Sequence, residues 1–290
     1  MTPKTSMKAA FAASFLALAA CSNGSSEAPK ASGAAPTKVS EAVTLDSVLA
    51  HPRRADETAR DKYRNPKPTL EFFEVTPGKA VAEIWPGWYT NVIAPYLAQN
   101  GGTYTAVLLP ESLGERIVER NKNYKEKYAD ASVYGDIQYG EYFSDIDNMV
   151  APDSQDVVLT FRNVHNWMGR DYADHAFASF YKALKPGGIL GVVEHRLPET
   201  ATQDPKGKTG YVQESYMKDL AARAGFEFVG SSEVNANPKD TADHPYGVWT
   251  LLPRSRTPKA DDAEAVNFDA EKFKSIGESD RATLKFRKPL

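Results

Sequence analysis

The most constraining feature of the sequence is a series of short apolar runs that alternate with helical patterns. Four of these runs are almost entirely apolar and lie at residues 79–85, 103–109, 156–161 and 189–194. A strand without a polar side is buried on both faces, which is typical of a parallel sheet covered by helices on each side. The pattern therefore predicts an α/β fold with a doubly wound, mostly parallel sheet.

Weaker patterns extend the predicted sheet to seven strands. The three additional strands are expected at residues 136–143, 226–234 and 283–288. No helical crossover of ordinary length separates the last two, so the last strand is expected to be antiparallel. The intervening patterns predict four helices, at residues 91–99, 112–129, 172–184 and 211–224.

Local residues define how some helices begin and end. Thr90 is a candidate N-cap for the helix at 91–99, and Asn100-Gly101-Gly102 is a stop signal after it. Residues 39–49 are weakly apolar and are expected to contain a short helix. The charged segment 51–65 predicts a solvated helix that Pro66 and Pro68 end.

Composition excludes several classes of protein. The chain has 35 Lys and Arg against 38 Asp and Glu, a net charge of −3, which does not indicate nonspecific nucleic-acid binding. It has one cysteine, Cys21, which excludes a disulfide scaffold and a cysteine-rich zinc module. No G-x-S-x-G, Walker or H-E-x-x-H motif is present.

The single cysteine follows a segment with the features of a secretory signal. Lys4 and Lys8 precede an uncharged run at residues 9–20, which is too short to span a bilayer as a permanent helix. The run ends Leu-Ala-Ala before Cys21 and resembles the bacterial lipobox, which implies cleavage before Cys21 and lipidation of its thiol. An ordinary signal peptide with a chance cysteine is the alternative.

The segment after Cys21 predicts a tether and a location. Residues 22–40 are mostly Ser, Ala, Gly and Pro without apolar periodicity, as in a flexible linker. We therefore expect a signal peptide at 1–20, a lipidated tether at 21–40 and a folded domain at 41–290. A lipobox implies the periplasmic face of a bacterial membrane, and Ser22 favours the outer membrane.

Two segments carry a resemblance to a known enzyme superfamily. Leu184-Lys185-Pro186-Gly187-Gly188 resembles the turn before the fifth strand of class I S-adenosylmethionine-dependent methyltransferases. The segment 161–166 (FRNVHN) resembles the one that follows the fourth strand in quinone-ring methyltransferases of this class. The span from about residue 58 to 290 is also similar to a family of predicted exported bacterial methyltransferases.

The resemblance implies a Rossmann-like methyltransferase fold with S-adenosylmethionine as cofactor. Its glycine-rich loop departs from the pattern, because residues 83–90 (EIWPGWYT) contain one glycine and are two residues shorter than the exported family's loop. We expect Trp88 to crowd the cofactor space. Glu111, the nearest acid after the second strand, either holds the cofactor's ribose or is a solvated loop acid. The cofactor-binding residues implied by the resemblance are Glu83, Trp85, Gly87, Tyr89, Glu111, Arg162 and Asn163.

Two histidines are the candidate catalytic residues. His165 and His195 follow the fourth and fifth strands, whose carboxyl ends meet at one edge of a doubly wound sheet. A neutral imidazole can act as a general base before methyl transfer, and the alternative for each is a structural histidine. Because no tight ligand spacing joins these histidines to Glu194, no metal site is expected.

The remaining site predictions concern a substrate pocket. The polar insertion, predicted at about residues 235–282, begins with a stretch at 235–250 that is long for a loop and is expected to cover the site. The candidate pocket residues are Asn166, Trp167, Arg196, Tyr211, Tyr246 and Trp249.

These features support three hypotheses for function. The first is a lipid-anchored methyltransferase that acts on a small molecule. The second is a ligand-binding lipoprotein on a degenerate methyltransferase fold, and the third is an interaction protein of the envelope. The expected partners are a small molecule and, through Cys21, a membrane; no nucleic acid is expected.

Overall fold

The computed structural model describes residues 43–259, 261 and 267–290. The predicted signal peptide, Cys21 and the whole predicted tether lie outside the described residues. Within them, seven strands form one sheet in the order β3-β2-β1-β4-β5-β7-β6. The strands are β1 (Ala80–Ile84), β2 (Thr103–Leu108), β3 (Gln138–Glu141), β4 (Gln155–Phe161), β5 (Leu184–His195), β6 (Glu227–Ser231) and β7 (Arg281–Arg287).

The sheet confirms the predicted doubly wound architecture. β3, β2, β1, β4 and β5 are parallel, whereas β7 is antiparallel to both β5 and β6. The chain builds outward from β1 in one direction and then from β4 in the other. The β1–β4 pair is therefore the topological switch point, where ligands bind in sheets of this type.

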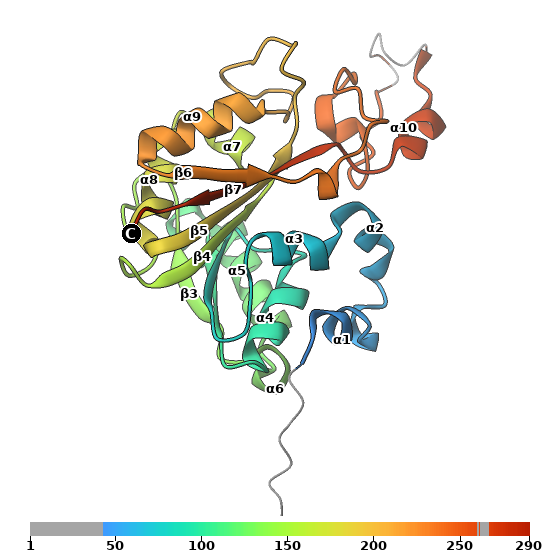
Figure 1. The fold of residues 1–290 in the computed structure, drawn as a ribbon. Coiled ribbons are helices and arrows are strands. Elements are labelled where there is room, and N and C mark those ends of the chain that lie inside the picture. The colour runs from blue at the N-terminus through green and yellow to red at the C-terminus, as the bar shows by residue number, and fades with distance from the viewer. Residues whose placement is uncertain (1–42, 260, 262–266) are drawn as a thin grey trace, which may run out of the picture. The chain divides into compact units, whose positions relative to one another are not determined.

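Helices cover both faces of the sheet (Figure 1). The longer ones are α3 (Pro66–Phe72), α4 (Thr90–Ala98), α5 (Glu115–Lys127), α8 (Ala173–Ala183), α9 (Glu214–Ala224) and α10 (Ala270–Ile276). Shorter α-helices are α1 (Leu45–Leu49), α2 (Asp61–Arg64), α6 (Ala131–Tyr134) and α7 (Val164–Met168). The 3-10 turns are η1 (Pro52–Arg54), η2 (Thr58–Arg60), η3 (Glu111–Leu113), η4 (Glu233–Asn235) and η5 (Gly247–Thr250).

Each face of the sheet has its own apolar core. On one face, α8 and α9 contribute Phe177, Phe180 and Leu220, all fully buried. On the other face, α3 and α4 contribute Leu70 and Ile93. This two-sided burial is the reason that the central strands show no polar face in the sequence.

The charged segment at residues 51–65 differs from its prediction. It forms the short elements η1, η2 and α2 rather than one solvated helix, and Arg54 and Arg64 are buried. α2 ends at Asn65, which has a left-handed backbone (φ 37°), and Pro66 begins α3 rather than only ending the preceding helix.

The start of α4 also differs from the prediction. Its N-cap is Tyr89, without a side-chain cap, so the predicted capping role of Thr90 is wrong. Thr90 Oγ1 instead lies 3.0 Å from the hydroxyls of both Tyr104 and Tyr124. Pro95 remains inside the helix, and the carbonyl of Asn91 that would face its missing N–H accepts a hydrogen bond from Arg53 Nη2 at 3.4 Å.

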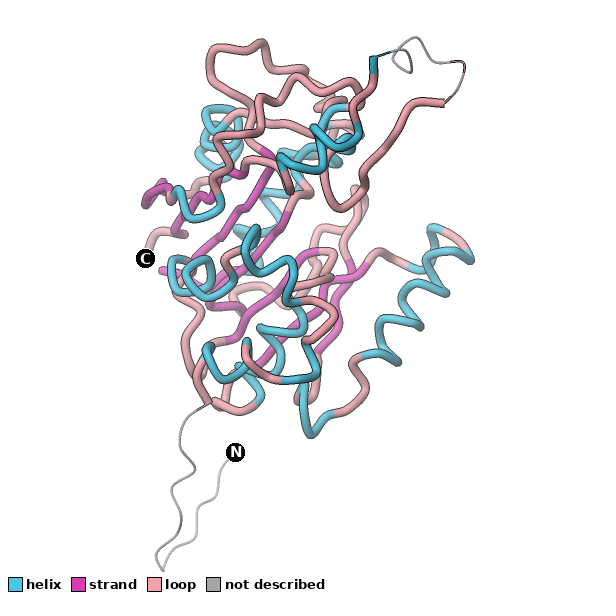
Figure 2. Tube along the Cα trace, turned by 90° about the vertical axis from the view of Figure 1, so that its right-hand side faces the viewer, coloured by secondary structure: helices cyan, strands magenta, loops and turns pink. Residues whose placement is uncertain are grey.

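The insertion between β6 and β7 is mostly loop (Figure 2). It contains η4, η5 and α10. No described helix has both the length and the apolar character that a bilayer crossing requires.

A glycine on β5 provides a test of this packing. A Cβ at Gly191 would lie 2.6 Å from Phe73 Cγ and 2.7 Å from Leu159 Cδ2. We expect Gly191→Ala to lower the free energy of unfolding by about 1–3 kcal/mol, because the core there has no room for a methyl group. Gly230→Ala on β6 is the control, since a Cβ there meets nothing within 4 Å. Equal denaturation midpoints for the two variants would contradict the packing described.

Candidate functional site

A cavity of about 500 Å³ lies at the carboxyl ends of β1 and β4. It is built from the loops that follow these strands, from the charged N-terminal segment and from the insertion before β7. Several residues selected from the sequence line it: Trp85, Gly87, Arg162, Asn163, His165, Asn166, His195 and Trp249. The insertion covers the cavity through Val248, Trp249 and residues 252–254.

The buried carboxylate of Glu83 stabilises the loop between β1 and α4 by a hydrogen bond. Glu83 Oε1 accepts a hydrogen bond from the Gly87 amide at 3.3 Å, and its Oε2 accepts one from the Tyr104 hydroxyl at 2.6 Å. Burial raises the pKa of Glu83 to about 7, although both hydrogen bonds oppose the shift. Glu83 therefore positions the loop and does not line the cavity.

Two non-glycine residues at this edge have unusual backbone conformations. Trp85 has φ 50° directly after β1, and Arg162 has φ 63° directly after β4. Both line the cavity. Positive φ is strained for such side chains and tends to occur at functional sites, where it directs a side chain that a relaxed strand would direct elsewhere.

His165 is oriented by a buried carboxylate. Its Nδ1 lies 3.1 Å from Glu194 Oε1, and Glu194 also accepts hydrogen bonds from the backbone amides of Val164, at 2.6 Å, and His195, at 2.9 Å. A carboxylate beside Nδ1 favours the tautomer with the proton on that atom, which leaves Nε2 as an acceptor. His165 lines the cavity, so this arrangement can supply a general base there.

His195 lies next to His165, with 5.6 Å between the ring centroids. Its Nδ1 is hydrogen-bonded to the Ser279 hydroxyl. Burial holds the pKa of His195 well below its ordinary value, and the neighbouring His165 and Arg281 lower it further. His195 is therefore an uncharged imidazole at neutral pH.

The structure brings His165, Glu194 and His195 close enough to form a metal-ligand cluster, with ligand atoms within 4.8 Å of one another. The sequence predicted that the two histidines meet at one edge of the sheet, but their spacing did not indicate a metal site. Glu194 is already occupied by hydrogen bonds, and the arginines nearby disfavour a cation. We therefore interpret the cluster as a carboxylate-oriented imidazole pair.

Six arginines also line the cavity, and the sequence prediction named only one of them, Arg162. The other five are Arg60, Arg64, Arg120, Arg254 and Arg281. Arg60 and Arg64 belong to the segment that was predicted to be solvated. Only charge patterning at residues 51–65 could have suggested them, and it did not indicate which residues turn inward.

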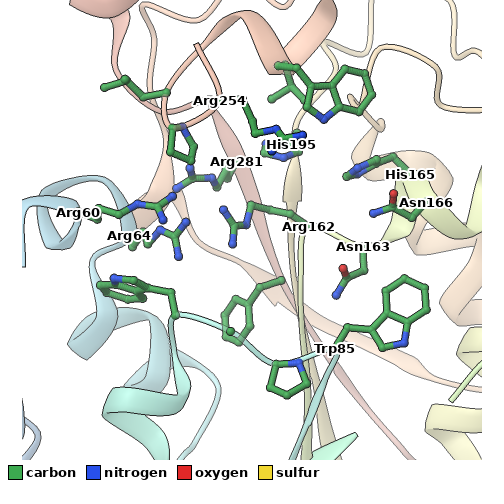
Figure 3. A pocket seen from close by; sticks show the side chains of 18 of the residues that line it. Arg60, Arg64, Trp85, Arg162, Asn163, His165, Asn166, His195, Arg254 and Arg281 are labelled. Atoms are coloured by element: carbon green, nitrogen blue, oxygen red, sulfur yellow. The ribbon is translucent and has the colours of Figure 1, made fainter. Parts of the chain in front are cut away.

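Glu278 is the shared partner of three of these arginines. Its carboxylate pairs with Arg60 at 2.6 Å, with Arg64 at 3.3 Å and with Arg281. These arginines hold the pKa of Glu278 at about 2, below its ordinary range, even though burial opposes the shift. Figure 3 shows the guanidinium groups of Arg60, Arg64, Arg162 and Arg281 close together, with His165, Asn163 and Asn166 on the other side of the cavity.

Other predicted site residues lie outside the cavity lining. Glu111 is exposed and pairs with Lys125 at 3.6 Å, which agrees with a solvated loop acid and not with a ribose-binding residue. Tyr89 stacks on Phe161 and donates its hydroxyl to the Arg64 carbonyl. Trp167 is fully buried beneath Trp85.

The side chains of the three remaining predicted pocket residues, Arg196, Tyr211 and Tyr246, make other contacts. Arg196 forms ion pairs with Asp280, Glu214 and Glu233. The Tyr211 hydroxyl donates to the Asp240 carboxylate at 3.0 Å. Tyr246 packs against Arg256, whose guanidinium lies 4.2 Å from the ring centroid. None of the three lines the described cavity, so the structure does not support them as substrate contacts.

Comparison with solved structures identifies the fold. A protein from Bacillus halodurans to which methyltransferase activity is attributed superposes with a TM-score of 0.50 at 14% identity, over 78% of this chain and 100% of that one. The chain thus has a Rossmann-like methyltransferase fold. At this identity the similarity establishes the fold and leaves the activity to the site.

Two further structures give weaker similarity. An S-adenosylmethionine-dependent methyltransferase from Aquifex aeolicus has a TM-score of 0.47 at 14% identity, covering 67% of this chain and 94% of that one. The [4+2]-cyclase SpnF has a TM-score of 0.49 at 16% identity, covering 78% and 80%. Both TM-scores are below 0.5, so neither similarity supports a conclusion about this chain. No protein-family model and no curated protein sequence matches it.

The cavity offers several, but not all, of the contacts that S-adenosylmethionine needs. A Cβ at Gly87 would meet nothing within 4 Å, so a ligand can approach this backbone closely. Trp85 lines the cavity and is a candidate for stacking with an adenine, and the arginines suit a carboxylate. Trp88 also lines the cavity, but the guanidinium groups of Arg54 and Arg64 lie over its ring, at 5.2 and 4.9 Å from the centroid. Among the described residues that line the cavity, none is Asp or Glu, so the ribose hydroxyls lack their usual acidic partner.

The Glu278 cluster predicts a pH-dependent stability. Because its pKa is depressed in the folded state, Glu278 contributes stability above the ordinary pKa of 4.5, which is lost as the pH falls toward 2. This contribution is about 3 kcal/mol. We expect Glu278→Gln to lower the free energy of unfolding at pH 7 by about 3–5 kcal/mol, because three arginines lose their counter-charge.

Urea denaturation between pH 2 and 7 tests this expectation. Asp46→Asn, which removes the exposed pair with Lys67, is the control and should cost under about 1 kcal/mol. A Glu278→Gln variant as stable as the control at pH 7 would show that the cluster does not depend on this carboxylate.

Proposed function

We propose that the chain is an S-adenosylmethionine-dependent methyltransferase that acts on a small molecule. The observation that carries the proposal is the placement of the cavity: it lies at the switch point of a methyltransferase fold, with the carboxylate-oriented His165 on its wall. The bound cofactor would supply an electrophilic methyl group. Gly87 and Trp85 are the residues that would hold it.

Residues of the chain would accept the proton that the methyl acceptor loses. His165 Nε2 accepts a proton from a hydroxyl, amine or acidic carbon, and Glu194 stabilises the imidazolium that forms. His195, kept uncharged, lies beside it as a second acceptor. Trp249 lies 6.0 Å from the His165 ring, measured between centroids, and helps to exclude water from this wall.

Calorimetric titration with S-adenosylhomocysteine tests cofactor binding. We expect saturable binding to the unmodified chain and at least a tenfold loss for Gly87→Ile, because a branched side chain would fill the space above the loop. Gly230→Ile, on an open surface of β6, is the matched control. Absence of binding at millimolar ligand, or equal binding by Gly87→Ile, would reject this assignment.

A second candidate is a ligand-binding protein that has lost methyl transfer. The observation that favours it is the absence of an acid among the described cavity-lining residues, together with the single glycine of the β1–α4 loop. Inserting two glycines between Gly87 and Trp88 separates the two candidates. Binding of S-adenosylhomocysteine only by the insertion variant would favour the binding protein.

We also propose that the protein is a lipoprotein on the periplasmic face of a bacterial membrane, with Ser22 favouring the outer membrane. The basis is the Leu-Ala-Ala-Cys sequence that ends at Cys21 and the linker composition of residues 22–40. We expect Cys21→Ser to move the protein from the membrane to the soluble fraction of bacterial cells, because its acyl chains provide the anchor. Ala20→Ser, which leaves the thiol in place, is the control. Membrane retention of Cys21→Ser would contradict lipidation.

A further inference from the structure

The arginines of the cavity converge from segments far apart in the sequence. Arg60 and Arg64 come from η2 and α2, Arg162 follows β4, and Arg281 begins β7. Figure 3 shows their guanidinium groups directed toward one another, with Arg254 nearby. Three segments that are far apart in the sequence thus bring positive charge to one place.

This charge is not neutralised within the described part of the chain. Glu278 is the one carboxylate that pairs with Arg60, Arg64 and Arg281. Arg162 makes no side-chain hydrogen bond or ion pair with any described residue. Within the cluster, Arg60 Nη2, Arg64 Nη1 and Arg281 Nε are buried without a hydrogen-bond partner among the described residues.

Such an arrangement is costly unless a ligand compensates for it. Burial, together with a neighbouring arginine, lowers the pKa of Arg64 to about 9 and that of Arg162 to about 10. Like charges brought together out of water repel one another, and a bound anion would relieve the repulsion. The strained backbone of Arg162, with φ 63°, adds to the cost of holding its side chain at this position.

The chemistry of the lining indicates which anion fits. Guanidinium groups bind phosphate and carboxylate oxygens in pairs, and several such groups around one point suit a doubly charged, tetrahedral anion. The volume of about 500 Å³ exceeds what a single inorganic phosphate needs. Phe161, Trp88 and Trp249 supply apolar surface for the rest of the ligand.

We propose that the cavity binds an organic phosphate ester, with the phosphate at Arg64, Arg162 and Arg281 and the organic part against the aromatic wall. The role of this ester as methyl acceptor rests on the proposed function, whereas its binding does not. The phosphate could belong to a soluble metabolite or to a lipid headgroup, since both present the same group to the arginines.

Calorimetry at low salt with phenyl phosphate, inorganic phosphate and phenol tests the proposal. We expect phenyl phosphate to bind most tightly, inorganic phosphate at least tenfold more weakly, and phenol not measurably. Affinity should fall as salt is added, because charge dominates the binding. No binding of phenyl phosphate at millimolar concentration, or equal binding of phenol, would overturn the proposal.

Variants of Arg162 separate a binding role from a structural one. We expect Arg162→Gln to weaken the binding of phenyl phosphate at least tenfold. Without ligand, this variant should unfold at the same temperature as the unmodified chain or at a higher one, because a repelling charge has been removed. Arg162→Lys should retain part of the affinity. Arg223→Gln, which removes an exposed pair with Asp174, is the control. Unchanged affinity in Arg162→Gln, or a lower unfolding temperature without ligand, would show that Arg162 is not a binding residue.

Two further arms identify the source of the phosphate and separate this proposal from methyl transfer. Competition by vesicles that contain phosphatidic acid would indicate a lipid headgroup, and its absence a soluble ester. S-adenosylhomocysteine is titrated into the same samples. Phosphate-ester binding without cofactor binding would retain the anion site and reject the methyltransferase, whereas the reverse result would reject the anion site alone.

Discussion

The cavity depends on one carboxylate, that of Glu278, surrounded by three guanidinium groups. Through it, η2 and α2 at the start of the domain are joined to the beginning of β7 near its end. The pKa of Glu278, about 2, shows how strongly the arginines favour its charged form. Without this carboxylate, the buried guanidinium of Arg64 would lack a counter-charge.

The cavity at the ends of β1 and β4 combines features of a common fold with residues that are particular to this chain. The switch point between β1 and β4 belongs to the architecture and provides a crevice at the strand ends. What this chain adds there is unusual: two non-glycine residues with positive φ, a carboxylate-oriented histidine, and arginines without an acid among the described lining residues. The two proposals, methyl transfer and binding of an anionic ligand, are compatible if the anion is the methyl acceptor.

The strands were predictable because their signal is local. Residues 103–109 and 156–161 are apolar on both faces, and this pattern arises only where helices cover both sides of the sheet. The positions of His165 and His195 were predictable for a related reason, since residues that directly follow parallel strands gather at one edge. The charged segment at 51–65 was not predictable in this way, because the burial of Arg64 depends on Glu278, more than two hundred residues away.

By itself, the sequence determined the α/β class, the order of the elements, the edge of the sheet at which the candidate site lies and the candidate lipidation of Cys21. These follow from local apolar periodicity and short motifs, whose physical causes act within a few residues. Only the tertiary structure decided that Glu111 lies outside the cavity, that Glu194 orients His165, and that arginines from three segments converge. Ion pairs and hydrogen bonds of this kind depend on distances of 3–4 Å between residues remote in sequence, and only the packed chain sets those distances.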